Sequence, residues 1–477
     1  MVGLTARQRP TGIRFLRSVK LSNHKPKNSF PMHVWKFGGT SVGKPDRMQS
    51  IRTLITADDT RKIVVLSALS GTTNELLAIG ESLKSNDDAG ANAKIDALKA
   101  HYDKFIGGFY KTDEGKAAGQ QAVDNEFSLI RSLTRINPFT LKQEKELVAE
   151  GELLSTQIFQ AYLVEEGVAS TLLPALEFMR IDADNEPDIQ YTEQRLAEIL
   201  PQHADKQIIV TQGFICRNPR GEIDNLKRGG SDYTASLIGG AIRADEIQIW
   251  TDIDGMHNND PRIVRNTFPV RELTFDEAAE LAYFGAKILH PSTITPARMF
   301  GVPVRLKNTM DPSAPGTLIT ERTGAPTVND QVFKAVAAKD GITALYIHSS
   351  RMLNAYGFLR RIFEIFEKYK TPVDMLATSE VSVSVTIDNT ERIEEISAEL
   401  STFCALEEPD YDQTIICIVG NFSADNEGVA VRVFNAMKNI PIRMISYGGT
   451  ESNLSLLVHS RYKVHALNAL NEGLFSA

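Results

Sequence analysis

The segment His33–Gly43 reads HVWKFGGTSVG and carries the pattern that decides the fold. The apolar run His33–Phe37 is typical of a buried strand, and the glycines after it mark a turn into an amphipathic stretch. Four more runs have this strand character and are separated by segments with helical periodicity: Ile63–Ser67, Gln207–Gly213, Glu246–Thr251 and Val302–Leu306. Strands that alternate with helices predict an α/β fold with a mostly parallel sheet sandwiched by helices.

Two segments show the helical repeat most clearly. In Leu141–Glu166, apolar residues such as Leu147, Leu154 and Ile158 recur about every four positions, and Ser231–Ala244 has a similar apolar face. In sheets of this class, ligands bind at the carboxyl ends of the strands. The glycine-rich and polar motifs of this chain fall at those ends.

The bulk composition limits the classes of protein to consider. The chain has 477 residues, which predicts two to four domains, and 42% hydrophobic with 23% charged residues is ordinary for a soluble globular protein. A net charge of −8 gives no reason to expect a nucleic-acid or membrane partner. The three cysteines, Cys216, Cys404 and Cys417, form no CxxC pair, which argues against a disulfide framework or a zinc site.

The first 31 residues differ from the rest of the chain. They contain seven basic residues and no aspartate or glutamate. We expect a disordered basic extension, or translation that starts at Met32. An organelle transit peptide shares this composition and is the less favoured alternative, so a cytoplasmic location is expected.

The character of the chain changes after about Thr317. The stretch Asp311–Pro326 contains prolines and glycines and is typical of a linker. Beyond it, GFLRRIFEIFEKYKTP at 357–372 resembles GVAVRVFNAMKNIP at 428–441, and each leads into two strands, which predicts two tandem strand–helix–strand–strand units. We divide the chain into the extension (1–31), an α/β domain (32–318), a linker (319–335) and two α+β units (336–408 and 409–477).

The glycine loop after the first strand is a possible phosphate site. Its glycines allow backbone N–H groups to approach an anion closely, and Lys36 beside it can neutralise phosphate charge. The sequence is neither GxxxxGK[ST] nor GxGxxG, so it is neither a P-loop nor a dinucleotide fingerprint. From these residues alone, phosphate binding and a plain strand-to-helix turn are equally supported.

Four other motifs lie where strands or helices end. SALSGTTN at 67–74 can bind a carboxylate or cap a helix, and capping is favoured locally. RGGSD at 228–232 offers an arginine for a carboxylate and an acid that can orient a lysine or magnesium, or only begin a helix. WTDIDG with DPR, at 250–262, fits a nucleotide grip or a turn, and the lysine of FGAKILHP at 284–291 is more often solvated.

One helical carboxylate, Glu152, can bind an ammonium group, although such residues usually lie at the surface. The sequence shows no Ser-His-Asp pattern, no His/Cys set with metal spacing and no aromatic–basic stripe. We therefore predict no protein-held metal site.

In this order, the motifs KFGGTSVG, SALSGTTN, GEL, RGGSDYTA, WTDIDG…DPR and FGAKILHP resemble those of the amino-acid kinase superfamily and, within it, the aspartokinases. The resemblance runs from Met32 to the C-terminus, and six ordered motifs make it highly specific. It implies the amino-acid kinase fold and transfer of the γ-phosphoryl group of ATP, with Mg²⁺, to the side-chain carboxylate of L-aspartate.

The resemblance also implies roles for single residues. Lys36 matches the lysine that stabilises the transferring phosphoryl group, and Asp232 the second catalytic residue. Aspartate would contact Ser67, Thr73, Glu152, Arg228, Gly229, Gly230 and Ser231. ATP would contact Lys36, Gly38, Gly39, Thr251, Asp252, His257, Arg262 and Lys287. His257 stands where the family often has tyrosine.

The repeated tail resembles paired ACT domains, the regulatory modules of this family, whose last segment typically folds back to complete the first unit. ACT domains usually pair between subunits, which implies a homodimer or tetramer. A lysine-binding pocket is implied at Met352, Gly357, Phe358, Leu359, Asp374, Ser379, Glu380 and Val381. Asn354 and Ala355 depart from the His-Ser pair of some lysine-inhibited members, so threonine or little regulation remain alternatives to lysine.

The expected function is a monofunctional kinase at the first step of aspartate-family (lysine, threonine, methionine, isoleucine) biosynthesis. One alternative is a kinase of another acid, such as glutamate or acetylglutamate. The alternative from another class is a non-catalytic ACT-domain amino-acid sensor. Nucleotide binding separates the two classes, because a pure sensor has no need of ATP.

Overall fold

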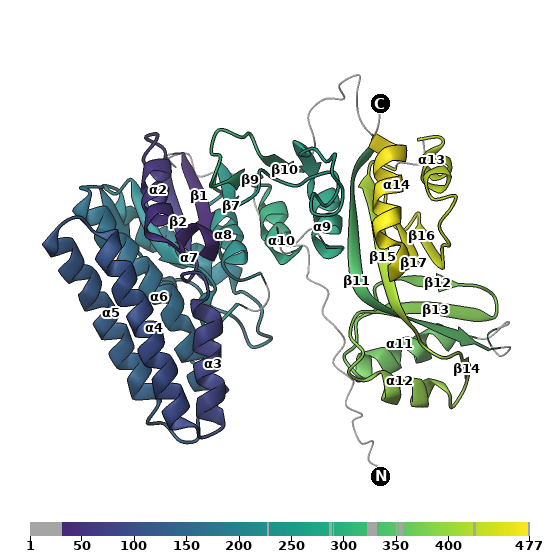
Figure 1. Ribbon diagram of the computed structural model, residues 1–477, viewed down its shortest axis with the longest axis horizontal. Coiled ribbons are helices and arrows are strands. Elements are labelled where there is room, and N and C mark those ends of the chain that lie inside the picture. The colour runs from purple at the N-terminus through teal and green to yellow at the C-terminus, as the bar shows by residue number, and fades with distance from the viewer. Residues whose placement is uncertain are drawn as a thin grey trace, which may run out of the picture. The chain divides into compact units, whose positions relative to one another are not determined.

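The computed structural model describes residues 31–226, 229–285, 289, 291–321, 332–349, 352, 356–422 and 426–475. Within these ranges the chain forms two large sheets that are covered by helices (Figure 1). No helix of the described residues is long and apolar enough to cross a membrane. The predicted extension, up to residue 30, lies outside the described residues.

The first sheet has eight strands in the order β3-β4-β2-β1-β7-β9-β10-β8. All neighbouring pairs are parallel except β9 and β10, so the prediction of a mostly parallel sheet is confirmed. The five strands predicted from the sequence are present, with ends shifted by at most two residues. The strands are β1 (Met32–Phe37), β2 (Arg61–Leu66), β3 (Ser170–Leu172), β4 (Ile208–Gln212), β7 (Glu246–Thr251), β8 (Glu272–Thr274), β9 (Val304–Asn308) and β10 (Thr317–Thr320).

Helices cover both faces of this sheet, because successive side chains of each strand point to opposite faces. Trp35 and Phe37 of β1 pack into one core with the first group of helices, whereas Val34 packs into the other core. The first group is α1 (Gly39–Val42), α2 (Pro45–Ile55), α3 (Thr72–Lys84), α4 (Asp88–Phe109), α5 (Asp113–Leu133) and α6 (Leu141–Glu165). The second group is α7 (Ile189–Ile199), α8 (Gly230–Ala241), α9 (Phe275–Tyr283) and α10 (Pro291–Phe300).

Helix α6 shows how local sequence fixes an element that later carries the site. Thr140 and Gln143 form a capping box at its start, which satisfies backbone N–H groups that the helix leaves free. Leu147, Leu154 and Ile158 are fully buried on one face. The helix therefore packs along the sheet (Figure 1), and its polar residues are fixed relative to the strand ends.

The second sheet is antiparallel and has the order β12-β13-β11-β15-β17-β16, with β14 also paired to β11. The repeat predicted from the sequence is confirmed, since each copy is a helix followed by two paired strands. The strands are β11 (Phe333–His348), β12 (Leu376–Thr378), β13 (Ser382–Ile387), β14 (Ala405–Leu406), β15 (Asp410–Gly420), β16 (Met444–Tyr447) and β17 (Asn453–His459). The helices are α11 (Phe358–Lys368), α12 (Ile393–Leu400), α13 (Val429–Ala436) and α14 (Lys463–Phe475).

The long strand β11 belongs to both of the α+β units. Its first part, Phe333–Lys339, pairs with β15, and its last part, Thr343–His348, pairs with β13. The register shifts between Lys339 and Ile342, where Gly341 has a φ of +74° that favours glycine. Two separate apolar cores flank the strand, one with α11 and α12 and the other with α13 and α14.

The bounds predicted for the linker overlap two strands. The segment 319–335 begins inside β10, whose β-branched residues pair with β8 and β9, and ends inside β11, while 322–331 lies outside the described residues. That the C-terminal segment completes the first unit stays a prediction. Helix α14 packs with Phe333 and Val336 of β11, the second of which falls in the predicted first unit, whereas the core around α11 and α12 holds no described residue beyond Leu406.

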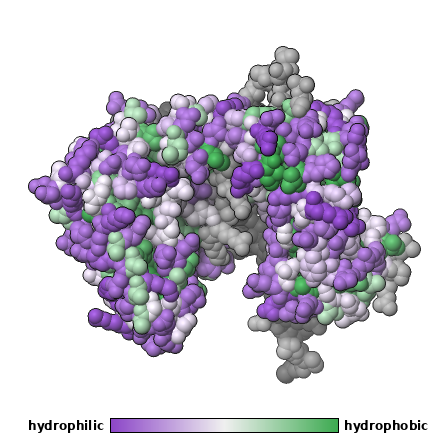
Figure 2. All heavy atoms as spheres, viewed as in Figure 1, coloured by the Kyte–Doolittle hydropathy of each residue, from purple (hydrophilic) through white to green (hydrophobic). Residues whose placement is uncertain are grey.

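Apolar side chains gather inside the layers, as burial of apolar surface requires. Tyr102, Phe37 and Phe109 are among the largest side chains that are fully buried. The face of the molecule in Figure 2 is covered mainly by hydrophilic residues, with apolar ones in small separate groups. The folded layers, rather than this face, account for most of the apolar content of the sequence.

Candidate active site

The carboxyl ends of β1, β2 and β7 lie side by side at one edge of the first sheet, because these neighbouring strands are parallel. Lys36 lies near the end of β1, Ser67 directly follows β2 and Thr251 ends β7. A hydrogen bond between Ser67 and Ser231 brings the start of α8 to this edge. The motifs that were far apart in the sequence therefore meet where the sheet predicts a ligand.

Lys36 and Asp232 form an ion pair at the centre of this edge. Lys36 Nζ lies 2.6 Å from Asp232 Oδ1, and the two side chains are 13% and 17% exposed. Asp232 is in the first turn of α8, where the helix dipole stabilises a negative charge. The pair holds an ammonium group in a fixed and largely desolvated position.

The glycine loop lies directly beside this ammonium group. A Cβ atom on Gly38 would lie 3.2 Å from Lys36 Nζ, and one on Gly39 would lie 3.2 Å from the carbonyl oxygen of Ala68. A Cβ atom on Gly43 would lie 2.7 Å from Cβ of Ser70. The loop therefore packs against the SALSGTTN segment so closely that side chains are excluded, which leaves its backbone open toward the lysine.

Three hydroxyl groups connect the end of β2 with α6 and α8, and Gly213, directly after β4, packs against the start of α8. Ser67 Oγ donates to Ser231 Oγ at 2.9 Å, and Ser155 Oγ of α6 donates to the carbonyl oxygen of Ser67 at 2.8 Å. Ser231 is 8% exposed, and Gly229 and Gly230 before it have positive φ values of 97° and 42°. Thr73, the second residue of α3, is half-buried. The sequence-predicted contacts Ser67 and Ser231 are thus brought together.

Replacing Gly213 with alanine is expected to distort this junction. The added Cβ would lie 2.3 Å from Cβ and 2.7 Å from Cα of Ser231, so the start of α8 must shift. Such overpacking costs about 1–3 kcal/mol, and we expect a lower melting temperature together with a loss of activity at this site. Gly107→Ala in α4 is the control, because a Cβ atom added at Gly107 would meet nothing within 4 Å. Equal melting temperatures and activities for both variants would contradict the proposed tight contact.

Glu152 is buried next to the same edge. It is 4% exposed, and its Oε1 accepts from the backbone N–H of Ala68 at a long 3.4 Å, while its Oε2 has no hydrogen-bond partner among the described residues. Burial disfavours the charged form and raises the pKa of Glu152 to about 8. The local expectation that a helical carboxylate lies at the surface is wrong here. An unpartnered buried carboxyl group is suited to receive an ammonium group.

Three residues predicted to contact the nucleotide line one cavity of about 360 Å³. They are Asp252, His257 and Arg262, which all follow the end of β7. Apolar side chains, among them Ile253 and Leu281, line the same cavity. Thr251 does not line it, and its hydroxyl group donates to Asp252 Oδ1 at 3.2 Å. A mostly apolar cavity with a few polar groups is the usual form of a small-molecule site.

The polar groups of this cavity are already held in place. His257 Nε2 lies 2.7 Å from Asp254 Oδ1, and its Nδ1 lies 3.1 Å from Thr267 Oγ1. Both ring nitrogens are engaged, so the ring face is what remains for stacking. Arg262, whose side chain is 73% exposed, binds Asp260 through Nε and Nη2 at 2.9 and 2.7 Å, which lowers the pKa of Asp260.

Some predicted residues lie outside the described residues. They are Arg228, predicted to contact aspartate, and Lys287, predicted to contact ATP. Asn354 and Ala355, near the predicted regulatory pocket, also lie outside the described residues. Gly229 follows Arg228 directly, and Gly285, close to Lys287, lines the nucleotide cavity.

A pair of hydroxyl groups that the sequence did not indicate supports the glycine loop. Ser41 Oγ and Thr309 Oγ1 lie 3.0 Å apart and both residues are buried. The backbone N–H of Thr309 donates to the carbonyl oxygen of Thr251 at 2.7 Å, so the segment after β9 ties the loop to β7. Thr309 is 268 residues from Ser41 and lies three residues beyond the strand predicted at Val302–Leu306, so no direct signal in the sequence indicated this contact.

The predicted regulatory residues differ in exposure. Asp374 has a fully buried side chain, and its Oδ1 lies 2.7 Å from both Lys339 Nζ and the hydroxyl group of Tyr283 at the end of α9. Gly357, with a φ of +81°, precedes α11, and the ring of Phe358 lies against Phe403. Met352 is partly buried against the same core. The side chains of the remaining members lie at the surface in this structure: Leu359, Ser379, Glu380 and Val381.

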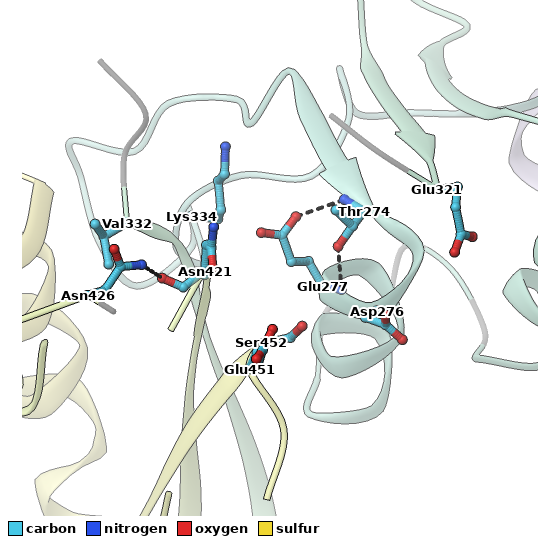
Figure 3. Close-up of a pocket in the computed structure, with 11 residues that line it drawn as sticks. Thr274, Asp276, Glu277, Glu321, Val332, Lys334, Asn421, Asn426, Glu451 and Ser452 are labelled. Atoms are coloured by element: carbon cyan, nitrogen blue, oxygen red, sulfur yellow. Dashed lines mark hydrogen bonds between the residues drawn. The ribbon is translucent and has the colours of Figure 1, made fainter. Parts of the chain in front are cut away.

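A second cavity of about 360 Å³ lies between α9 and the strands β11 and β15. Figure 3 shows its acidic side chains, including Asp276, Glu277 and Glu451. Glu277 is already used as a helix cap, because its Oε2 accepts from the N–H of Thr274 at 2.7 Å. None of the predicted site residues lines this cavity, and we assign it no ligand.

Comparison with known proteins agrees with this arrangement. A model of the amino acid kinase family matches residues 31–308, and a model of the ACT domain matches residues 416–474. The lysine-sensitive aspartokinase 3 of Escherichia coli is 34% identical over 93% of this chain and 99% of the relative. The chloroplastic aspartokinase 1 of Arabidopsis thaliana is 34% identical over 93% of this chain and 80% of the relative.

Solved structures give the same result. The crystal structure of E. coli aspartokinase III with aspartate and ADP, called the R-state, has a TM-score of 0.81 at 33% identity and covers 93% of this chain and all of the other. The same enzyme with lysine and aspartate, called the T-state, has a TM-score of 0.75 over the same shares. With its parallel sheet, its ordered motifs and its ACT region, this chain belongs to the amino acid kinase family and, within that family, to the aspartokinases.

Proposed function

We propose that this protein transfers the γ-phosphoryl group of ATP to the β-carboxylate of L-aspartate and so forms 4-phospho-L-aspartate and ADP. The observation that carries the proposal is the Lys36–Asp232 pair, which lies at one sheet edge with the Ser67–Ser231 contact. The neighbouring cavity with Asp252, His257 and Arg262 supports a nucleotide beside it. This reaction is the first step of aspartate-family amino-acid biosynthesis.

The reaction requires no covalent bond between the protein and the transferred phosphoryl group. A β-carboxylate oxygen of aspartate attacks the γ-phosphorus, the bond from that phosphorus to the bridging oxygen breaks, and ADP leaves with the electron pair. The attacking carboxylate is already ionised near neutral pH, so no general base is required. Positioning and charge stabilisation are what the site must supply, and the Lys36 ammonium group is placed to do so.

Two groups suit the α-groups of aspartate. The carboxyl group of Glu152 is the partner we assign to the α-ammonium group, because one of its oxygens has no other partner among the described residues. Arg228 is assigned to the α-carboxylate on the strength of the family motif alone. Thr73, Gly229, Gly230 and Ser231 are assigned as the remaining contacts of this substrate.

Magnesium is proposed to enter with ATP. A carboxylate beside transferring phosphates is a typical Mg²⁺ partner, and Asp232 beside Lys36 fits that requirement. The bound ion would neutralise charge on the phosphate oxygens. The residues of this chain would orient the acceptor and exclude water.

The direct test is ADP release from the purified protein with ATP and magnesium. L-aspartate, L-glutamate and no acceptor are compared, each with and without L-lysine. Turnover that requires aspartate supports the proposal, and turnover only with another acid assigns a different acceptor. ATP binding without turnover on any acceptor would contradict the kinase proposal, and lysine binding without ATP binding would favour the non-catalytic sensor.

Feedback inhibition by lysine is the proposed regulation, in keeping with the name of the E. coli relative. Asp374 Oδ2 is buried without a hydrogen-bond partner among the described residues, while Oδ1 is paired with Lys339. A free lysine ammonium group could thus bind Oδ2 while Lys339 keeps its place at Oδ1. Threonine and little regulation are the alternatives, and the lysine arm of the assay decides whether lysine inhibits.

Replacing Asp374 with asparagine is expected to raise the lysine concentration for half-inhibition by at least about tenfold, because a charge-assisted hydrogen bond is lost. Inhibition curves at fixed ATP and aspartate measure this shift. Asp388→Asn is the matched control, because Asp388 also pairs with Lys339, at 2.9 Å, but is not one of the assigned pocket residues. An equal shift in both variants would place the effect in the Lys339 network rather than in effector binding.

A homodimer or tetramer is proposed to form through the regulatory units. The apolar side chains Leu376, Ile445 and Tyr447 on β12 and β16 are exposed, and such side chains usually find a partner surface. Light scattering of the purified protein measures the mass. A cytoplasmic location is likewise proposed, and imaging of a fluorescent fusion to residues 1–31 tests it.

A further inference from the structure

The nucleotide cavity has walls from two parts of the chain. Asp252, His257 and Arg262 come from the segment after β7, in the catalytic domain. Val336–Ala338 of β11 and Lys463 and Leu467 of α14 come from the regulatory part and line the same cavity. The last helix of the chain therefore faces the proposed ATP site directly.

Buried amide side chains fasten the nucleotide segment to this helix. Asn258 is fully buried, and its Nδ2 donates to Asn471 Oδ1 at 3.0 Å. Asn259 is 3% exposed, and its Nδ2 donates to the carbonyl oxygen of Leu467 at 3.0 Å. Asn471 Nδ2 in turn donates to the carbonyl oxygen of Asn266 at 3.3 Å. Both ends of the 258–266 segment are thus bonded to α14.

The same contacts decide the shape of the segment that carries His257 and Arg262. Asn258 closes it into a loop, because its backbone N–H and its Oδ1 bond to the backbone of Phe268 at 3.0 and 2.8 Å. The backbone N–H of Val336 donates to the carbonyl oxygen of Asn258 at 2.8 Å. Removing the partner of a buried amide leaves an unsatisfied donor, so the loop is expected to relax when Asn471 is lost.

Apolar packing continues the contact on either side of these hydrogen bonds. The rings of Phe268 and Phe475 meet edge to face with centroids 5.9 Å apart. Val264, which is 3% exposed, lies in the same core as Leu467. The catalytic domain alone therefore does not satisfy the groups of its own nucleotide loop.

Lys463 brings a cation to the cavity. Its side chain is 22% exposed and its Nζ lies 2.5 Å from Asp340 Oδ2, which uses only one of three donors of the ammonium group. Arg262 is the second cation of the cavity lining, and its charge is already paired with Asp260. Asp252 and Asp260 line the same cavity and offset these two charges, but the donors that Lys463 leaves unused suit the phosphates of a nucleoside diphosphate whose base lies in the apolar part of the cavity.

We propose that helix α14 of the regulatory part is a component of the nucleotide site, in which Asn471 positions the loop of His257 and Arg262 and Lys463 binds the phosphates of the nucleotide. This inference rests on the proposed kinase function and extends it. It makes ATP affinity depend on how the regulatory part packs, because a shift of α14 would displace the loop that carries His257 and Arg262.

Two substitutions test the proposal in the full-length protein. Asn471→Leu keeps the side-chain volume but removes the amide, and Lys463→Met keeps the length of the side chain but removes the charge. The matched controls are Glu472→Gln and Lys438→Met, which are exposed residues of the same regulatory unit. The dissociation constants of ADP and of adenosine are measured by calorimetry, together with KM for ATP and for aspartate and the melting temperature.

We expect Asn471→Leu to weaken ADP binding and raise KM for ATP by about tenfold, with KM for aspartate unchanged. Lys463→Met is expected to weaken ADP but not adenosine. Unchanged ADP affinity in both variants, or KM values for the two substrates that rise together with a falling melting temperature, would overturn the inference. If wild-type protein binds ADP without aspartate turnover, the proposed function fails while the ADP measurements still decide the role of α14.

Discussion

Replacing Lys36 with methionine is expected to lower kcat by about two to three orders of magnitude, which corresponds to about 2.7–4 kcal/mol of transition-state stabilisation. The ammonium group lies 2.6 Å from Asp232 in a largely buried site beside the glycine loop, so it has little freedom to reorient. Without Lys36, no other cationic side chain of the described residues is placed to stabilise the charge that develops on the phosphoryl oxygens. Steady-state kinetics with saturating ATP and aspartate measure the effect.

The control for this substitution is Lys44→Met. Lys44 lies just after the same loop but is exposed, and we expect its removal to leave kcat almost unchanged. If Lys36→Met raised KM for ATP with kcat intact, Lys36 would bind ATP in the ground state rather than stabilise the transition state. An unchanged kcat and KM would remove Lys36 from the mechanism altogether.

Replacing Glu152 with glutamine is expected to raise KM for aspartate by about a hundredfold or more, because an ammonium group would be left in a buried site without its counter-charge. Burial raises the pKa of this carboxyl group to about 8. In the free protein the group is therefore mostly protonated at neutral pH, and it must release its proton to pair with an ammonium group. The KM for aspartate at saturating ATP measures the loss.

The pH dependence of the same constant is a second expected result for Glu152. Below about pH 8, binding of aspartate releases one proton, so the affinity for aspartate should rise by up to about tenfold per pH unit and level off above that pKa. Glu152→Gln should abolish this slope. Glu150→Gln is the matched control, since Glu150 is buried two residues away and its pKa is raised by burial and by the neighbouring Glu126, but it is not assigned to the substrate. A flat profile in the wild type would contradict the assigned pairing.

The sequence predicted the elements of the sheet well, because each strand is a short apolar run between turn residues. It also placed Lys36, Ser67 and Thr251 at strand ends, and parallel neighbours then bring such ends together. Whether Glu152 lies at the surface or in the interior was not predictable from its own neighbours. Its burial is produced by the packing of α6 against the segment after β2, which only the three-dimensional structure contains.

The regulatory part shows the same limit more clearly. The repeat of two helices was predictable because each copy begins near a glycine and ends near a proline. The hydrogen-bond partner of Asn471 was not predictable, since Asn258 lies 213 residues earlier and neither asparagine belongs to a periodic pattern. The predicted linker started too early for a related reason: the prolines and glycines before Thr317 concealed that β10 still belongs to the first sheet.

The shared strand β11 means that the two regulatory units are not interchangeable modules. A chain cut after the first unit would keep Phe333–Lys339 but lose β15, and its backbone N–H and C=O groups would become a bare sheet edge. A transplanted second unit without this segment would in turn leave β15 without its partner strand on this side. Insertion, duplication or loss of a single ACT copy would therefore damage both, so that the pair can be inherited or engineered only as one piece.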